Sequence, residues 1–421
     1  MGSSFWRLFG AYAINTVGDE FYALALPLVL LASGYPGASV TFLFGVLTAS
    51  TVAAGFVVGY LVDRYPPRGI LTTSYLASAA ILSLGVGAVA AGADGYAVAL
   101  AGAAILGVFA ALSAAAVDAG IPRTVAREGQ AGRGYSLVES ARTAALIFGP
   151  ACAGLVTLIS NLLWVLSANA GSFLLAAAIS HTRDTAARRR RAPSEPVFAM
   201  IRDGLRAVLR NRALAIGIGL SLLANITLGA EQPLFLTRFV RDFGVSGVLT
   251  SAVVIAAGLS AIATSLALPH LARRLTARTA MIWSCVASAL AAAGIGLTTN
   301  PPLAAVLYCV LCASTISYNV YWRTYRQQAV PADLLGRVSA TCRSLAYSGI
   351  VLGTALVGAF QQAGATTGLL FTVGGLACLT GMLIGAFPSR ALFSAKRPIR
   401  DNRTESPPAP GDQRPEQPRH H

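Results

Sequence analysis

The chain is a series of long apolar runs separated by short polar loops. A helix of about 20 residues, at about 1.5 Å rise per residue, crosses the ~30 Å hydrocarbon core of a bilayer. Runs of this length predict membrane-spanning helices, and the sequence holds twelve of them. They are Leu8–Ser33, Val40–Val62, Ile70–Ala91, Tyr96–Val117, Ser136–Ile159, Leu162–Ser180, Ala213–Leu236, Gly247–Pro269, Ala280–Leu297, Leu303–Trp322, Ser339–Gln361 and Gly368–Phe387.

The loops between these runs alternate in charge. Every second loop is rich in arginine, and the loops between them hold almost none; Arg238 and Arg241 are the exceptions. Because arginine-rich loops stay on the cytoplasmic side of a membrane, this alternation predicts that both termini are cytoplasmic, in agreement with an even number of spans. We therefore expect a multi-pass protein of a bacterial cytoplasmic (inner) membrane.

The composition favours the same class. Of the 421 residues, 55% are hydrophobic and 12% are charged, about half the charge of a soluble fold. The 42 glycines suit closely packed membrane helices. A formal charge of +15 would also suit a nucleic-acid-binding protein. Since the basic residues gather in the loops, they indicate membrane topology, and we expect no nucleic-acid partner.

The two halves of the chain resemble each other. Residues 133–154 align with residues 337–358 at an offset of 204, which pairs Gly149 with Gly353 and Gly154 with Gly358. The starts of the two halves resemble each other more weakly, with Pro27 in the first half matching Pro233 in the second. Such a repeat predicts two six-helix halves related by a pseudo-twofold axis along the membrane normal, with a central cavity. The expected fold class is an all-α polytopic membrane protein.

This repeat divides the chain into four parts. We expect a first half at residues 1–181, a basic cytoplasmic linker at 182–212, a second half at 213–389 and a disordered tail at 390–421. The linker carries the run Arg188–Arg191. We expect this positive charge to contact anionic lipid headgroups of the bilayer.

Ionisable residues within the spans are the first candidates for function, since charge in hydrocarbon is costly unless it faces a cavity or a partner. Asp19 and Glu20 lie in the first span beside Asn15. Adjacent carboxylates repel each other, which favours a proton on one of them, as a proton carrier requires. The alternative is that Glu20 faces the headgroups and Asp19 merely accepts hydrogen bonds.

The fifth and eleventh spans hold further charges. Glu139 and Arg142 are three residues apart and share a helix face, so they are expected to neutralise each other. Arg343 stands at the repeat position of Glu139, and a Glu139–Arg343 pair across the halves is a plausible switch. Gly149, Pro150 and Gly154 lie in the fifth span, where Pro kinks a helix and Gly permits close packing. Such a bend suits gating and is also common in inert membrane helices.

The second half offers one more carboxylate. Glu231 and Gln232 precede Pro233 and form a polar stripe with Asn225, which lines the cavity or marks its outer mouth. Glu231 is a third proton-coupling candidate. Asn169 and Asn319 are further cavity candidates.

Other chemistry finds little support. The six cysteines lie in apolar runs, Cys309-x-x-Cys312 has no second pair or nearby histidine, and no metal site or P-loop is present. We expect no enzyme and no cofactor, a proton gradient as the energy source, protons and a small-molecule substrate as partners, and a monomer.

The loop between the second and third spans resembles the signature of the major facilitator superfamily, usually written G-x-L-a-D-r-x-G-r-[rk]. The matching residues are Gly59, Leu61, Asp63, Arg64 and Arg68. Pro66 and Pro67 replace the usual glycine and its neighbour, which stiffens the turn. The resemblance implies that Asp63 pairs near Arg337 at the start of the eleventh helix and latches the cytoplasmic side in an outward-open state.

Two further stretches resemble one branch of that family. Ala145–Gly154 is similar to the fifth-helix signature of proton-driven exporters, and residues 318–338 look like drug:proton antiporters that include macrolide and siderophore exporters. The resemblance covers nearly the whole chain and implies export of small amphipathic molecules by proton antiport with alternating access. The fourth-helix arginine of other antiporters is absent. An importer of the same fold stays open, and so does a channel or an intramembrane enzyme.

The signature loop gives a first test. Asp63→Asn should impair transport and leave the amount of protein in the membrane unchanged, because a latch and not a packed core is lost. Transport and membrane expression are measured side by side. Normal transport by this variant would remove the latch assignment.

Overall fold

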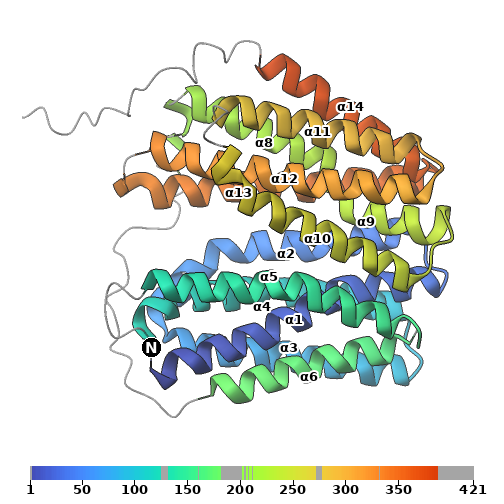
Figure 1. The fold of residues 1–421 in the computed structure, drawn as a ribbon. Coiled ribbons are helices and arrows are strands. Elements are labelled where there is room, and N and C mark those ends of the chain that lie inside the picture. Colours follow the sequence, from blue (N-terminus) through green and yellow to red (C-terminus); the bar gives the residue numbers. More distant parts are fainter. Residues whose placement is uncertain are drawn as a thin grey trace, which may run out of the picture.

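The structure is a computed structural model (Figure 1). It describes residues 2–124, 131–159, 161–181, 202, 205–206, 208–210, 212–271, 277–330 and 332–386. The predicted tail lies outside these residues, and so does most of the predicted linker.

The first half is built from six long helices. They are α1 (Ser3–Ala32), α2 (Gly37–Arg64), α3 (Pro67–Ala90), α4 (Gly95–Thr124), α5 (Ala131–Val156) and α6 (Leu162–Ser180). Each contains or closely matches one predicted span. Several helices run past the predicted span at the arginine-rich end, because a helix continues into the headgroup region after its apolar residues stop.

The second half begins with a broken helix. Its elements are α8 (Arg212–Leu228), α9 (Glu231–Thr237), the π-helix η2 (Arg238–Asp242), α10 (Gly247–Leu271), α11 (Ala277–Leu297), α12 (Pro301–Ala329), α13 (Ala332–Gln362) and α14 (Thr367–Ala386). Within the described residues, 11 helical segments are long and apolar enough to cross a membrane. The remaining long helix, α5, carries Arg133, Glu139 and Arg142.

The break between α8 and α9 has a local cause. Pro233 has no N–H to bond the carbonyl of Gly229, and glycine is about 1 kcal/mol less favourable than alanine in a helix. The corresponding residues of the first half are Pro27 and Ala23, and α1 runs through them unbroken. The repeat makes the seventh span equivalent to α1, and the glycine in the place of Ala23 therefore distinguishes the broken helix from the continuous one.

The contacts between helices repeat in the two halves. In the first half α1 packs against α5 and α6, α2 against α4, and α3 against α6; in the second, α8 packs against α13 and α14, α10 against α12, and α11 against α14. Between the halves, α5 contacts α10, and α13 contacts α2. Figure 1 shows the two groups side by side. This arrangement confirms the predicted fold of two pseudo-symmetric six-helix halves.

The two ends of the bundle differ in their turns. Gly34, Gly92, Gly244 and Gly364 have positive φ angles between 66° and 93° and end α1, α3, η2 and α13. Glycine adopts this conformation without the penalty that a Cβ brings. We call this the short-turn end. The opposite end, which holds the start of α1 and the α2–α3 turn at Arg64, is the basic end.

Glycines set the closest approach between helices. A Cβ at Gly149 of α5 would lie 2.8 Å from the backbone nitrogen of Phe21 on α1. Its repeat partner, Gly353 of α13, fits in the same way against the carbonyl oxygens of Asn225 and Ile226 on α8. The repeat alignment therefore identified glycines with equivalent packing roles, one in each half.

Replacing one of these glycines should weaken the first half. Gly149→Ala places a methyl group against the α1 backbone and should cost about 1–3 kcal/mol of stability, as overpacking does. Thermal unfolding in detergent measures the loss. Gly102→Ala on α4, where nothing lies within 4 Å of the added Cβ, is the matched control and should be neutral or slightly stabilising. Equal behaviour of the two variants would contradict the packing role.

Candidate functional site

The first-half candidates gather around Asp19. The side-chain nitrogen Nδ2 of Asn15 donates a hydrogen bond of 2.8 Å to Oδ2 of Asp19, one turn further along α1. Between them, Gly18 lets α6 approach, and a Cβ there would lie 2.9 Å from Oδ1 of Asn169. Asn15 and Asn169 are both buried. The structure thus brings three of the predicted residues together inside the first half.

Glu20 is held by a different set of contacts. Gly149 of α5 packs against its backbone, and a Cβ at Gly149 would lie 2.5 Å from Cβ of Glu20. Arg142 of α5 lies close enough to act electrostatically on the Glu20 carboxyl. Glu20 therefore has a basic neighbour on α5, whereas the side chain bonded to Asp19 is the neutral amide of Asn15.

Four charged residues form a second group nearer the basic end. Asp118 of α4 lies in electrostatic range of Glu139 and Arg142 of α5 and of Arg343 of α13. All four side chains are exposed. Among the described side chains, no ion pair joins Glu139, Arg142 and Arg343 to one another. Asp118 and Arg343, which belong to different halves, therefore attract each other here without forming an ion pair.

Pro150 lies within α5 where this helix meets the other half. Proline has no N–H to bond the carbonyl of Leu146, and this oxygen faces α10, 3.5 Å from where a Cβ on Gly258 would lie. One turn on, a Cβ at Gly154 would lie 2.9 Å from Cβ of Ser251, also on α10. Gly149 thus packs α5 against α1, and Gly154 and the Leu146 carbonyl pack it against α10; the bend itself stays a prediction.

Glu231 stands at the break in the seventh span. It is the first residue of α9 and is partly buried. Tyr308 and Cys312 of α12 lie in electrostatic range of its carboxyl. Asn225 of α8 turns its amide back to the carbonyl of Ser221, at 2.9 Å, so it does not contact Glu231 through that donor.

The remaining predicted residues are spread out. Gln232 follows Glu231 on α9 and is partly buried, and Asn319 of α12 is exposed. In the signature loop, Gly59 lies within α2, Arg64 ends that helix, and Arg68 lies in the first turn of α3. The side chains of Asp63 and Arg337 lie outside those that the structure describes, so the predicted latch stays a prediction.

The described contacts between the halves lie toward the short-turn end. Oγ1 of Thr41 on α2 donates a hydrogen bond of 2.7 Å to Oε1 of Gln361 on α13. Gly37 of α2 packs against Thr237 of α9, and Gly247 of α10 packs against Thr157 after α5. Small side chains and a hydroxyl thus close this end.

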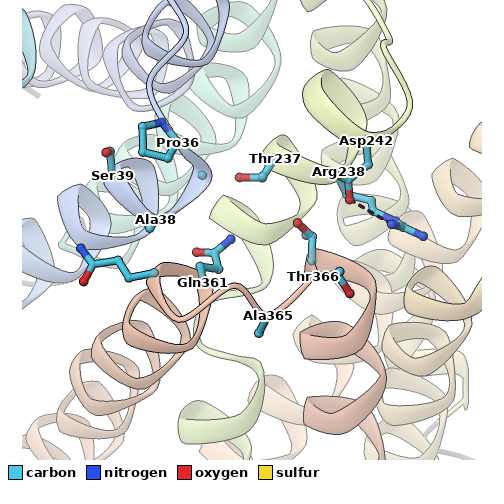
Figure 2. A pocket seen from close by; sticks show the side chains of 12 residues that line it. Pro36, Ala38, Ser39, Thr237, Arg238, Asp242, Gln361, Ala365 and Thr366 are labelled. Carbon is cyan, nitrogen blue, oxygen red and sulfur yellow. Dashed lines mark hydrogen bonds and ion pairs between the residues drawn. The ribbon is translucent and has the colours of Figure 1, made fainter.

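A pocket of about 620 Å³ opens beside this closure (Figure 2). It is lined by the start of α2, by α9 and η2, and by the α13–α14 turn. Arg238 at its wall pairs with Asp242 at 2.9 Å and donates to the carbonyls of Gly296 and Thr298 at the end of α11. This exception to the arginine pattern is therefore neutralised by an acid and by a helix C-terminus.

Sequence reasoning missed Asp118 and Tyr75. The predicted fourth span ends at Val117, one residue before Asp118, but α4 continues to Thr124. Tyr75 of α3 is 1% exposed and lies in electrostatic range of Asp19. Its only signal in the sequence is a tyrosine within an apolar span. Among the described residues, no group of three or more His, Cys, Asp and Glu is placed to hold a metal ion.

Comparison with known proteins places this geometry in context. Residues 8–354 match the family described as Major Facilitator Superfamily. The crystal structure of a mutant of the nucleoside transporter NupG superposes with a TM-score of 0.73 at 15% identity, covering 93% of this chain and 100% of that chain. A bacterial metal transporter superposes with a TM-score of 0.63 at 15% identity, covering 91% and 97%. No curated protein sequence matches the chain closely enough to count as a relative.

The closed short-turn end can be tested by cross-linking. In a variant whose native cysteines are replaced, Thr41→Cys with Gln361→Cys should be joined by a short thiol reagent, because the two side chains touch. Cleavage in the linker followed by a denaturing gel shows whether the halves stay joined. The control, Thr48→Cys with Gln361→Cys, moves the first thiol about 10 Å along α2 and should not be joined. Cross-linking of the control alone would contradict the described closure.

Proposed function

Since this chain belongs to the Major Facilitator Superfamily, we propose that it exports small amphipathic molecules across a bacterial cytoplasmic membrane by proton antiport. The chain is a multi-pass membrane transporter. Export, proton coupling and the substrate class are the proposal. The observation that carries it is a carboxylate, Asp19, inside the hydrocarbon span of α1, held by the buried amide of Asn15.

Alternating access needs two halves that close at one end and part at the other. Thr41, Gln361 and the glycine contacts hold the short-turn end together. Charged side chains of both halves are exposed toward the basic end. With the basic end on the cytoplasmic side, this arrangement suits a state that receives substrate from the cytoplasm.

The charged group near the basic end suits a state in which the basic end is closed and the short-turn end is open. We propose that Arg343 approaches the acids of the first half, Asp118 and Glu139, when this end closes. The electrostatic range between Asp118 and Arg343 supports this. Breaking the attraction on reopening would then be part of each transport cycle.

A proton carrier must load and release at different stages of that cycle. Asp19 lies near the middle of α1, whereas Glu20 has Arg142 as a compensating charge. Asp19 is therefore the better candidate for the coupling proton. Glu231, at the broken helix of the second half, is the second candidate.

Import by the same fold is the alternative. NupG, which shares the fold at 15% identity, is a nucleoside transporter, so a polar metabolite is a second substrate class. Counterflow of labelled nucleoside in proteoliposomes tests that class directly. A channel would instead show current that rises linearly with voltage without saturation by substrate.

The proton role of Asp19 gives the decisive experiment. An efflux screen of amphipathic compounds, in a strain that lacks its own exporters, first identifies a transported probe. In everted vesicles, transport of that probe should respond to an imposed pH gradient, and Asp19→Asn should abolish this response while downhill transport remains. Glu20→Gln is the matched control and should keep the response. If Asp19→Asn keeps it too, Asp19 is not the proton site.

A further inference from the structure

Two buried polar atoms near Asp19 lack a partner. Asn15 is 5% exposed and donates to Asp19 through Nδ2, but its Oδ1 has no hydrogen-bond partner among the described residues. Tyr75 of α3 is 1% exposed, and its hydroxyl also has none. Its ring packs against Phe173 of α6, with the ring centroids 6.2 Å apart. Each orphan atom costs about 1–3 kcal/mol, which Leu and Phe would avoid.

The surroundings of Asp19 explain why these two unpartnered polar side chains are retained. On α1 the neighbouring charge is Glu20, which repels a second negative charge. α6 contributes Asn169 and Ser172 beside Gly18, which are polar but uncharged. The charge that α5 supplies, Arg142, acts on Glu20. Tyr75 is the group that α3 brings into electrostatic range of the carboxyl.

The chemistry of the two protonation states assigns different tasks to the two neighbours. An amide nitrogen only donates, so Nδ2 of Asn15 suits the ionised carboxylate. A protonated carboxyl has its own O–H to donate and needs an acceptor. A hydroxyl donates to the ionised form and accepts from the protonated form, so one tyrosine suits both.

On the proposed role of Asp19 as the coupling site, we propose that Tyr75 and Asn15 are positioning residues of this proton site. Asn15 holds the ionised carboxylate in place. The Tyr75 hydroxyl, through one water molecule, bonds to it in both states and keeps the carboxyl in the same orientation as the proton arrives and leaves. Phenylalanine at position 75 would preserve the packing on Phe173 and lose this bond.

The test reads the carboxyl itself and needs no transported probe. Infrared spectra of the purified protein are recorded against pH, and the difference between the protein and its Asp19→Asn variant isolates the C=O band of Asp19. Tyr75→Phe should move this band to higher frequency and shift its titration midpoint upward by about 0.5–1 pH unit, since hydrogen bonds to the charged form are the stronger ones. Asn15→Leu should shift the midpoint in the same direction.

A second buried tyrosine provides the control. Tyr22 of α1 is 8% exposed and its hydroxyl also lacks a described partner, but no ionisable group acts on it. Tyr22→Phe should leave the Asp19 band and its midpoint unchanged. An unchanged band in both Tyr75→Phe and Asn15→Leu would overturn the positioning role. Failure of the coupling role is seen separately, as a pH-gradient response that survives in the Asp19→Asn vesicles.

Discussion

Hydrocarbon gives helices no hydrophobic reason to associate, because lipid tails are as apolar as leucine. What holds this bundle together is close contact between backbones, and glycine is the residue that permits it. Gly149 and Gly353 fix α5 on α1 and α13 on α8, one in each half. Gly154 and Gly358 then fit α5 against Ser251 of α10 and α13 against Phe42 of α2, across the halves. The same repeat therefore builds each half and joins the two.

Contacts of this kind suit a transporter that must rearrange. Within the halves, Gly149 and Gly353 meet the backbone of the neighbouring helix, whereas several contacts between the halves rest on side chains such as Thr41, Gln361, Thr237 and Ser251. A net hydrogen bond contributes about 1 kcal/mol, so a closure made this way is separable without unfolding either half.

Most of the fold could be predicted from the sequence. Apolar length located the spans, and the repeat predicted which glycines share a packing role, because both depend on local composition and spacing. The break between α8 and α9 could not be predicted in this way. Gly229 and Pro233 cause it, but a proline also stands at the equivalent position 27 of the first half, where α1 stays continuous. The candidate site was harder to predict from the sequence. Asp19 was visible as a charge in hydrocarbon, but Tyr75 approaches it only through the packing of α3, which no spacing along the chain reveals.

The break in the seventh span also makes the two carboxylates unequal. Asp19 lies in a continuous helix whose amide and hydroxyl neighbours belong to the same half, so its surroundings travel with it when the halves move. Glu231 begins a short helix whose next turns, Thr237 and Arg238, line the pocket between the halves. Tyr308 and Cys312 near Glu231 also belong to its own half, but α9 packs on Gly37 of α2, so opening the short-turn end must part α9 from the first half. Glu231 therefore stands on the element that borders the other half, whereas Asp19 lies in a continuous helix among neighbours of its own half.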